Sequence, residues 1–366
     1  MSVAVGIVGT SWWTDAMYLP ALSNHPDVEI VAICGRNQER AAQMAHTWSI
    51  PNAYSDYTRM IEQEKLNALF VLSGNDSHYA ITMAGLNAGL HVLCEKPLGL
   101  NYLQAMEMAS LAEAKQVKQM VPFTYRFMPT NRYIKELLNE GYLGQPYHLN
   151  LRYYTGFGRQ PGYNWRFDQS KAGSGAIGDI GSHFLYLAMW WFGEIVEISC
   201  QSSFLSSRPA HNPEGHPYTQ SEDGAIMTLI FANGAHGVVH ATTMAYEETP
   251  FGQTHHAELH GSDGTLYGFI DWDKIQTVRG AKVGEGIIQE LILPAHIWGS
   301  ARQDTVHNTY RDIFRQQDHM ARGFINSIRD DTPSTPNFAD GAAVQRLIDA
   351  AMLSDKERRR VRVAEI

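Results

Sequence analysis

Short apolar runs alternate with longer segments of helical period over the first 122 positions of the chain. Each run is rich in apolar, often β-branched residues and ends in a turn signal, which is the pattern of a strand buried on both faces. The predicted strands are Ala4–Val8, Val28–Cys34, Ala68–Leu72 and His91–Cys94. Between them, Ala, Met, Leu and Glu recur at helical spacing in Gln38–Trp48, Tyr57–Gln63, Ser77–Ala88 and Leu103–Lys115. This alternation predicts βαβ units, and hence a parallel sheet with helices on both faces.

The pattern changes after Val121. A helix-like segment and glycine-rich loops are followed by long strand-like stretches, and the predicted elements are a helix at Asn131–Asn139 and strands at Tyr147–Tyr154, Gly224–Phe231 and Gly237–Met244. The last two strands are joined through Ala232-Asn233-Gly234, a hairpin signal. We therefore expect a large, mostly antiparallel sheet with helices on one face. Helical period returns at residues 317–329 and 340–353.

These patterns predict an α/β chain of two domains, as the length of 366 residues also favours. Residues 1–122 are expected to form a doubly wound Rossmann domain. Residues 123–366 are expected to form an α+β domain for substrate binding and oligomerisation. We expect the C-terminal helix, at about 340–353, to pack back on the first domain.

Composition and charge narrow the class of protein. With 44% hydrophobic and 18% charged residues, the chain has the composition of a soluble globular protein. No stretch of about 18 apolar residues predicts a membrane span, and the N-terminus enters a strand pattern at once, so we expect neither membrane insertion nor a secretory signal. A net charge of −9 with scattered basic residues argues against a nucleic-acid partner. The dispersed Cys34, Cys94 and Cys200 suit a reducing cytoplasm.

The turn after the first predicted strand is an altered phosphate-binding motif. It reads GTSWWT, with Gly9, Ser11 and Thr14 at the positions where a dinucleotide-binding turn has three glycines. Gly9 permits the tight turn, and Ser11 is small enough for a pyrophosphate to approach the backbone. An ordinary strand-to-helix turn would also explain these residues. Trp12 and Trp13 either wall the hydride-transfer site or begin the helix and fill the gap beneath it.

The end of the second predicted strand bears on cofactor choice. An acid at this place would bind the ribose diol of NAD, but the residues are Gly35-Arg36-Asn37. The absence of an acid removes a repulsion against a 2′-phosphate, and Arg36 can pair with that phosphate and stack on adenine. This favours NADP over NAD, although Arg36 is also explained as an exposed loop residue.

Two motifs resemble the Gfo/Idh/MocA oxidoreductase family: HVLCEKPL at residues 91–98 and GDIGSH at residues 178–183. The spacing of about 80 residues between EKP and D-x-x-x-H is specific. The resemblance extends over essentially the whole chain through GNDSH at residues 74–78, YRFMP at 125–129, NEGYLGQPY at 139–147 and WRF at 165–167. GNDSH departs from the family's usual Thr-Pro-Asn-x-x-His, because Ser73 and Gly74 stand for Thr and Pro.

The resemblance implies that Lys96, Asp179 and His183 are the catalytic groups. Asp179 and His183 are four residues apart and share one face if the segment is helical. His183 is expected to exchange the proton of the substrate oxygen, Lys96 to position and polarise that oxygen, and Asp179 to orient the substrate or assist. The roles of Lys96 and His183 can be exchanged. A capping aspartate and a core histidine are the structural alternative.

Further residues are expected to bind cofactor or substrate. The expected cofactor-binding residues are Gly9, Ser11, Trp12, Trp13, Arg36, Ser73, Asn75, His78, Glu95 and Lys96. The expected substrate-binding residues are Tyr125, Arg126, Trp165 and Arg166, because aromatic faces and guanidinium groups suit hydroxylated or anionic sugars. Packing and surface ion pairing would explain the second set equally well. His255, His256 and His260 fit a hydrogen-bonded strand better than a metal site, so we expect no metal.

The sequence thus predicts a cytoplasmic NAD(P)-dependent dehydrogenase acting on a CH–OH group of a sugar, polyol, inositol or related cyclic hydroxy compound. The resemblance also implies a homodimer or homotetramer. Two other functions remain open. One is a non-catalytic NADP-binding regulator. The other is a redox-assisted glycosidase that retains its NAD tightly and oxidises the sugar only transiently.

Overall fold

The chain divides into two compact units. The computed structural model describes residues 2–249 and 252–366. Unit 1 comprises Met1–Phe123 and Arg311–Ala343, and unit 2 comprises Thr124–Tyr310 and Val344–Ile366. The second part of unit 1, Arg311–Ala343, lies mostly before the helix expected at about 340–353, whose residues 344–353 fall in unit 2. It includes α11 (Met320–Arg329), and α10 (Val306–Arg315) and α12 (Phe338–Glu357) each contribute residues to both units.

Unit 1 contains a six-stranded sheet, sheet A, in which all neighbouring strands are parallel. Its strand order is β3-β2-β1-β4-β5-β6. This order reverses direction between β1 and β4, which is the place where doubly wound sheets bind nucleotides. The strands are β1 (Val3–Val8), β2 (Val28–Cys34), β3 (Asn52–Tyr54), β4 (Ala68–Val71), β5 (His91–Cys94) and β6 (Gln119–Met120).

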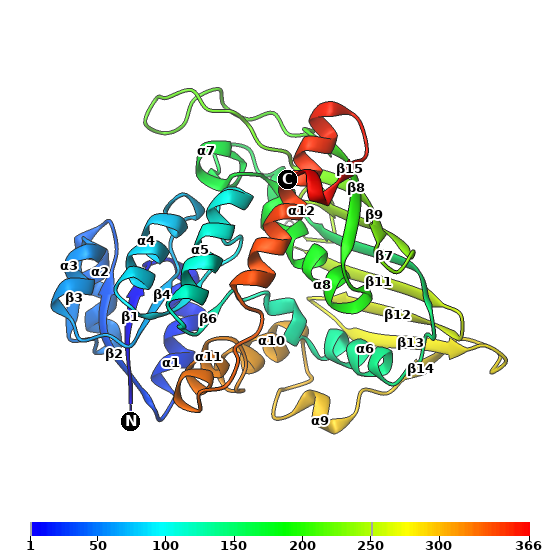
Figure 1. Cartoon of the computed structure of the whole chain (residues 1–366), viewed down its shortest axis with the longest axis horizontal. Helices are drawn as coiled ribbons and strands as arrows, with labels where there is room; N and C mark the ends of the chain where they lie inside the picture. The colour runs from blue at the N-terminus through cyan, green and yellow to red at the C-terminus, as the bar shows by residue number, and fades with distance from the viewer. Residues whose placement is uncertain (1, 250–251) are drawn as a thin grey trace. The chain divides into compact units, whose positions relative to one another are not determined.

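The helices of unit 1 pack on sheet A. Besides the C-terminal helices already given, they are the π-helix η1 (Thr14–Tyr18), α1 (Leu19–Ser23), α2 (Gln38–Trp48), α3 (Tyr57–Gln63), α4 (Asn75–Asn87) and α5 (Tyr102–Ala114). Although α11 is some 300 residues from α1 in the sequence, the two lie side by side (Figure 1) and α11 also contacts β1 and β5. The rings of Phe70 and Phe324 meet edge to face at 5.7 Å in this contact, and both are fully buried. Burying each ring contributes about 1.5–3 kcal/mol, so α11 is part of the core of unit 1.

Unit 2 contains a nine-stranded sheet, sheet B, of order β14-β13-β12-β11-β7-β10-β9-β8-β15. All pairs are antiparallel except β7 with β10. Buried and half-exposed residues alternate along the central strands, because one face of the sheet lies on the core. The strands are β7 (Pro146–Thr155), β8 (Ile195–Ser203), β9 (Gly224–Phe231), β10 (His236–Thr242), β11 (Gln253–Gly261), β12 (Gly264–Asp271), β13 (Gln276–Lys282), β14 (Gln289–Leu291) and β15 (Val361–Arg362).

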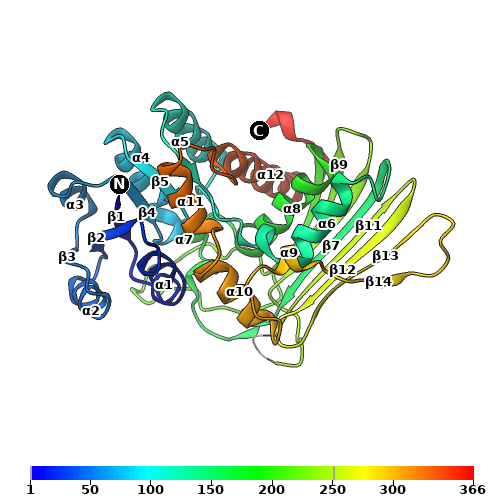
Figure 2. The ribbon, with the colours of Figure 1, turned by 90° about the horizontal axis from the view of Figure 1, so that it is seen from below.

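Helices cover one face of sheet B, as Figure 2 shows for α6 and α8 beside the central strands; α6 contacts β12 and β13, and α8 contacts β7. The helices of unit 2 are η2 (Thr124–Phe127), α6 (Pro129–Asn139), η3 (Phe157–Arg159), η4 (Trp165–Phe167), α7 (Gln169–Ala172), the π-helix η5 (Ile177–Gly181), α8 (Ser182–Phe192), α9 (Ala295–Trp298) and η6 (Val363–Glu365). The predicted fold class, a Rossmann sheet plus an α+β part with a mostly antiparallel sheet, is confirmed.

In residues 2–249 and 252–366, every helix is too short or too polar to cross a membrane. The cytoplasmic location stays a prediction.

Candidate functional site

The turn after β1 brings the backbone of Gly9 close to the chain just after β4. Gly9 has a φ of +133°, and a Cβ atom at this position would lie 2.3 Å from the carbonyl oxygen of Leu72, just after β4. Only glycine fits so close to a neighbouring backbone. Ser11 starts the following helical segment, since its Oγ accepts a hydrogen bond from the Thr14 backbone N–H at 3.2 Å. The turn therefore has the tight first glycine and the helix start that a pyrophosphate site needs.

The two tryptophans of this turn have different surroundings. Trp12 is 66% exposed, whereas the indole N–H of Trp13 donates to Oε1 of Glu95 at 2.9 Å. The hydroxyl of Tyr18 donates to the same oxygen at 2.7 Å, and the backbone N–H of Lys96 donates to Oε2 at 3.1 Å. The Glu95 carboxylate thus fixes the Trp13 ring and the backbone at Lys96. These bonds give Glu95 a supporting role at the predicted cofactor site.

Arg36 is exposed directly after β2. Asn37 caps α2 by accepting a hydrogen bond from the backbone N–H of Arg40 at 2.9 Å, which explains why that helix begins at Gln38. Gly35 packs against Thr10, because a Cβ atom there would lie 2.6 Å from the Thr10 methyl carbon. The structure therefore brings the end of β2 next to the glycine turn, with the Arg36 side chain in solvent.

The loop after β4 carries Ser73, Asn75 and His78. Ser77 donates to the Ser73 hydroxyl at 2.7 Å, and Asn75 lies buried in the first turn of α4. His78 is fully buried, with Nδ1 2.9 Å from the Pro97 carbonyl oxygen and Nε2 3.2 Å from that of Ser73. Burial lowers the pKa of His78, so the imidazole is neutral, and its single N–H donates to one of these two carbonyls in the loops after β4 and β5. This position favours support of the predicted site over direct contact with a ligand.

Asp179 and His183 lie on one continuous helical segment, η5 followed by α8. Because the segment is helical, these residues, four positions apart, lie on the same side of it. The guanidinium Nε of Arg166 is 3.2 Å from Oδ2 of Asp179, and the same guanidinium lies 4.6 Å from the centre of the Trp165 ring. His183 is buried and stacks at 4.2 Å on the ring of Tyr125. Five of the six predicted site residues of unit 2 thus form two groups of contacting side chains. One group is Asp179, Arg166 and Trp165, and the other is His183 and Tyr125.

The sixth residue, Arg126, contacts α8 further along the helix. Its guanidinium donates to the hydroxyl of Tyr186 and lies 4.8 Å from the centre of the Trp190 ring. Tyr186 is one turn beyond Ser182 on the buried face of α8, so Arg126 is anchored on the helix that carries His183.

Sequence reasoning missed the residues packed around Tyr125. They are Tyr153 on β7, Gln253 and His255 on β11, and Trp272, and the sheet register pairs His255 with Tyr153. The strand alternation contained a signal, because His255 and Tyr153 fall on the inward positions of their strands. His256 and His260 fall on the opposite, half-exposed positions of β11. Over the described ranges, no group of three or more His, Cys, Asp or Glu side chains is arranged to hold a metal ion.

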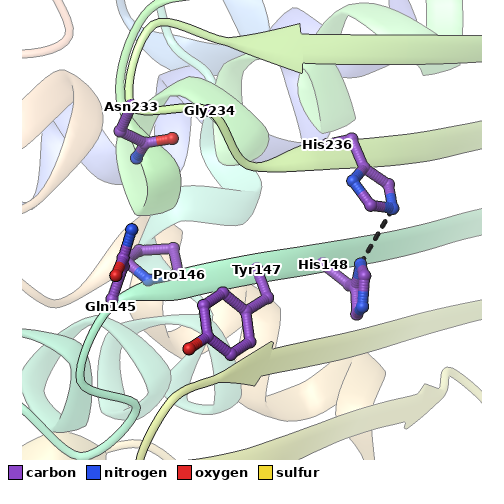
Figure 3. Close-up of a pocket in the computed structure, with 7 residues that line it drawn as sticks. All are labelled: Gln145, Pro146, Tyr147, His148, Asn233, Gly234 and His236. Carbon is purple, nitrogen blue, oxygen red and sulfur yellow. Dashed lines mark hydrogen bonds between the residues drawn. The ribbon is translucent and has the colours of Figure 1, made fainter.

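A shallow hollow of about 250 Å³ lies on the outer face of sheet B (Figure 3). His148 on β7 and His236 on β10 point into it, and their ring nitrogens are 2.8 Å apart. His148 and Tyr153 occupy outward and inward positions of the same strand, so this hollow is on the face opposite to His183 and Tyr125. It is not part of the predicted site.

The strand order of sheet A and the turn at Gly9 define the class of Rossmann dinucleotide-binding proteins. A family model described as an oxidoreductase family with an NAD-binding Rossmann fold matches residues 3–123, and one described as the C-terminal alpha/beta domain of that family matches residues 135–363. The chain belongs to this family, GFO_IDH_MocA, as its EKP and D-x-x-x-H motifs indicated.

Several relatives are similar over most of their length. Levoglucosan dehydrogenase of Pseudarthrobacter phenanthrenivorans is 28% identical over 91% of this chain and 89% of its own. The scyllo-inositol 2-dehydrogenase (NADP(+)) of Bacillus subtilis is 26% identical over 72% and 75%, respectively. A solved structure of levoglucosan dehydrogenase in complex with NADH and levoglucosan has the same fold, with a TM-score of 0.86 at 24% identity over 99% of this chain and 100% of that one.

Proposed function

We propose that the chain is an NAD(P)-dependent dehydrogenase that reversibly oxidises one carbinol carbon of a sugar, polyol, inositol or related cyclic hydroxy compound. The observation that carries the proposal is the pairing of Asp179 and His183 on one helical segment, with Arg166 anchored on Asp179. The relatives named as sugar and inositol dehydrogenases support the substrate class.

The residues of unit 1 fit a dinucleotide. Gly9 permits the tight turn because a Cβ atom there would collide with the Leu72 backbone, and the helical segment after Ser11 directs backbone N–H groups toward the turn. Trp13 is fixed by Glu95 beside this turn, whereas Trp12 is exposed on it. A bound nicotinamide would supply the acceptor for the hydride that leaves the carbinol carbon.

His183 accepts the proton of the substrate hydroxyl during oxidation and returns it to the carbonyl oxygen during reduction. Lys96 holds and polarises the same oxygen, which develops negative charge as the proton leaves. Asp179 orients the substrate, with Arg166 fixing its carboxylate. Lys96 and His183 can exchange the acid–base and polarising roles without changing the balance of the reaction.

Replacing either Lys96 or His183 tests this assignment. We expect Lys96→Met and His183→Gln to lower turnover on the order of 100-fold or more, because each removes a group that acts on the reacting oxygen. Binding of NADPH or NADH, measured by the fluorescence of the reduced nicotinamide, should change little. Lys65→Met and His211→Gln, at exposed positions, are the matched controls. Full activity of Lys96→Met and His183→Gln on a substrate of the wild-type enzyme would contradict the assignment.

The stoichiometry of the same assay separates the other functions. A dehydrogenase forms one reduced nicotinamide for each carbonyl product, and absorbance during a sugar and polyol panel measures this. A redox-assisted glycosidase would release a cleaved sugar from an enzyme that keeps its cofactor, with no net reduction. A regulator would bind NADPH and turn over none of the panel.

Arg36 supports a preference for NADP. Its guanidinium is exposed at the end of β2, next to the glycine turn, where a 2′-phosphate would be bound. We expect NADPH to bind more tightly than NADH, and Arg36→Ala to weaken NADPH binding about 10-fold or more while leaving NADH within about 2-fold. Arg40→Ala, on the exposed face of α2, is the control. Tighter binding of NADH by the wild-type protein would overturn the preference.

A further inference from the structure

The ring of Tyr125 lies against the imidazole of His183. Their ring centres are 4.2 Å apart and their planes are inclined by 31°, so the imidazole rests on the face of the phenol ring. Tyr125 comes from η2 and His183 from α8, and both side chains are buried. Stacked rings attract each other and restrict each other's rotation, so this contact holds the imidazole in place.

The hydroxyl of Tyr125 is held on its other side by sheet B. It lies 2.7 Å from the hydroxyl of Tyr153 on β7 and accepts a hydrogen bond from the amide of Gln253 on β11 at 3.2 Å. The same Gln253 amide also lies 2.9 Å from Nε2 of His255. Since Trp272 can only donate, its indole N–H at 3.4 Å makes this Nε2 an acceptor and places the His255 proton on Nδ1.

Tyr125, Tyr153 and His255 do not change their charge at pH values near neutrality. Burial raises the pKa of Tyr125 to about 12, holds the pKa of Tyr153 well above its ordinary value, and lowers the pKa of His255 to about 3. Near neutrality all three are uncharged. The other titratable groups of unit 2 that interact with the two tyrosines are Asp179 and Tyr310. His183 therefore rests on a rigid, neutral support.

We propose that Tyr125 is a positioning residue for His183, with its ring supporting the imidazole and its hydroxyl anchored to β7 and β11 through Tyr153 and Gln253. This inference rests on the proposed role of His183 as acid–base. It differs from a substrate-binding role for Tyr125, since the hydroxyl already has two partners within the protein.

The two parts of Tyr125 can be removed separately. Tyr125→Phe keeps the ring and removes the hydroxyl that anchors it to Tyr153 and Gln253. Tyr153→Phe keeps Tyr125 intact and removes its hydroxyl partner on β7. We expect each to lower kcat about 3- to 10-fold with KM within about 2-fold, because the proton-transfer geometry loosens while substrate contacts remain. Tyr154→Phe is a matched control from the adjacent position of β7, where the hydroxyl faces His240 on the outer face. It should have wild-type kinetics.

Removal of the ring gives a second readout. Tyr125→Leu should lower kcat more than Tyr125→Phe, with KM again within about 2-fold, because the imidazole of His183 loses the ring on which it rests as well as the anchor. A general loss of structure would raise KM and weaken cofactor binding as well. If Tyr125→Leu does not fold, the two phenylalanine variants still test the anchor.

The outcomes separate the inference from the proposed function. A raised KM with unchanged kcat in Tyr125→Phe would show substrate contact and overturn the positioning role, as would unchanged kinetics in both phenylalanine variants. If His183→Gln is impaired in either of these cases, the proposed function stands and only the inference fails. Wild-type turnover by His183→Gln would instead remove the proposed function, and the inference with it.

Discussion

Two buried histidines, one in each unit, are held neutral by their surroundings. His78 lies between the backbone carbonyls of Pro97 and Ser73 in unit 1. His255 lies among Gln253, Trp272 and aromatic rings in unit 2. Burial lowers the pKa of both imidazoles, because an unpaired positive charge in an apolar interior loses its hydration. Such residues act as neutral hydrogen-bonding parts of the core, and they make stability depend on pH.

The pKa of His255 determines in which direction stability changes with pH and over which pH range the change occurs. Its pKa falls from 6.5 to about 3 in the folded protein, so between these values the unfolded chain binds a proton that the folded chain does not. Stability from this residue is complete above pH 6.5 and is lost as the pH falls toward 3. Between pH 7 and pH 5 the loss is about 2 kcal/mol.

Urea unfolding at pH 7 and pH 5 checks this value. His255→Gln should show a smaller difference between the two pH values, by about 2 kcal/mol, because glutamine does not titrate. The exposed His211→Gln should keep the full wild-type difference. Equal differences in wild-type protein and His255→Gln would show that His255 is not held neutral by the fold.

The sequence points to a candidate site where short motifs occur. EKP and D-x-x-x-H lead to the prediction that Lys96, Asp179 and His183 are catalytic, and these roles stay predictions. Tyr153 and Gln253 could not be found in this way, because they meet Tyr125 only through the register of β7 with β11, which joins positions about 100 residues apart. The supporting role of Glu95 depends likewise on distant partners.

At the scale of elements, the glycine turn joins β1 to the helical segment η1 and brings its backbone against the end of β4. The helical segment begins at Trp12 and contains a π-helix from Thr14 to Tyr18, a form that is rare and frequently found at functional sites. A second π-helix, η5, carries Asp179. The helical segments at both groups of predicted site residues therefore contain widened turns, which the sequence periodicity did not indicate.

Gly9→Ala tests the close approach at this turn. The new Cβ would lie 2.3 Å from the Leu72 carbonyl oxygen, so β1 and β4 would have to separate. We expect a loss of stability of more than about 2 kcal/mol and weaker NADPH binding. Gly89→Ala is a matched control, since Gly89 also has a positive φ but its added Cβ meets no atom within 4 Å. It should cost about 1 kcal/mol and leave cofactor binding intact. Thermal unfolding and nicotinamide fluorescence measure the two effects.

Elements with a clear hydrophobic pattern were predicted with accurate bounds. Short elements that depend on pairing with neighbouring strands were not predicted. Val28–Cys34 and His91–Cys94 match β2 and β5 in both bounds, because continuous apolar runs mark buried parallel strands. β3 and β6 have three and two residues and are not wholly apolar, so they carry too little pattern to be found. The place of α11 in unit 1 follows from its packing against α1, β1 and β5. The hydrophobic periodicity of a segment does not show which distant elements it contacts.

At the scale of the whole molecule, sheet B presents an open face. Helices α6 and α8 lie on one face, and the outward positions of β7, β9, β10 and β11 are half-exposed or exposed. The pairing register aligns polar outward residues in rows, such as His240, Arg152 and His256 across three neighbouring strands. A broad face with both apolar and polar positions suits contact with a second copy of the chain, as expected for a homodimer or homotetramer.

Light scattering coupled to size-exclusion chromatography tests this expectation. We expect the wild-type protein to have the mass of two or four chains. Ile226→Asp, which puts a charge on the 46% exposed outward position of β9, should reduce that mass. Ile292→Asp, at an 85% exposed position beyond β14, is the control and should not. A monomeric wild-type protein would contradict the expectation, and an unchanged mass in Ile226→Asp would place the contact elsewhere.

The division of the chain also sets the order in which its parts can mature during synthesis. Met1–Phe123 leaves the ribosome first, yet its sheet lacks the ring of Phe324 and the rest of α11 until about 200 further residues have been made. Most of unit 2 is thus an insertion within unit 1. The nascent Met1–Phe123 segment must therefore wait with an uncovered apolar face until α11 has been made, although it is translated before unit 2.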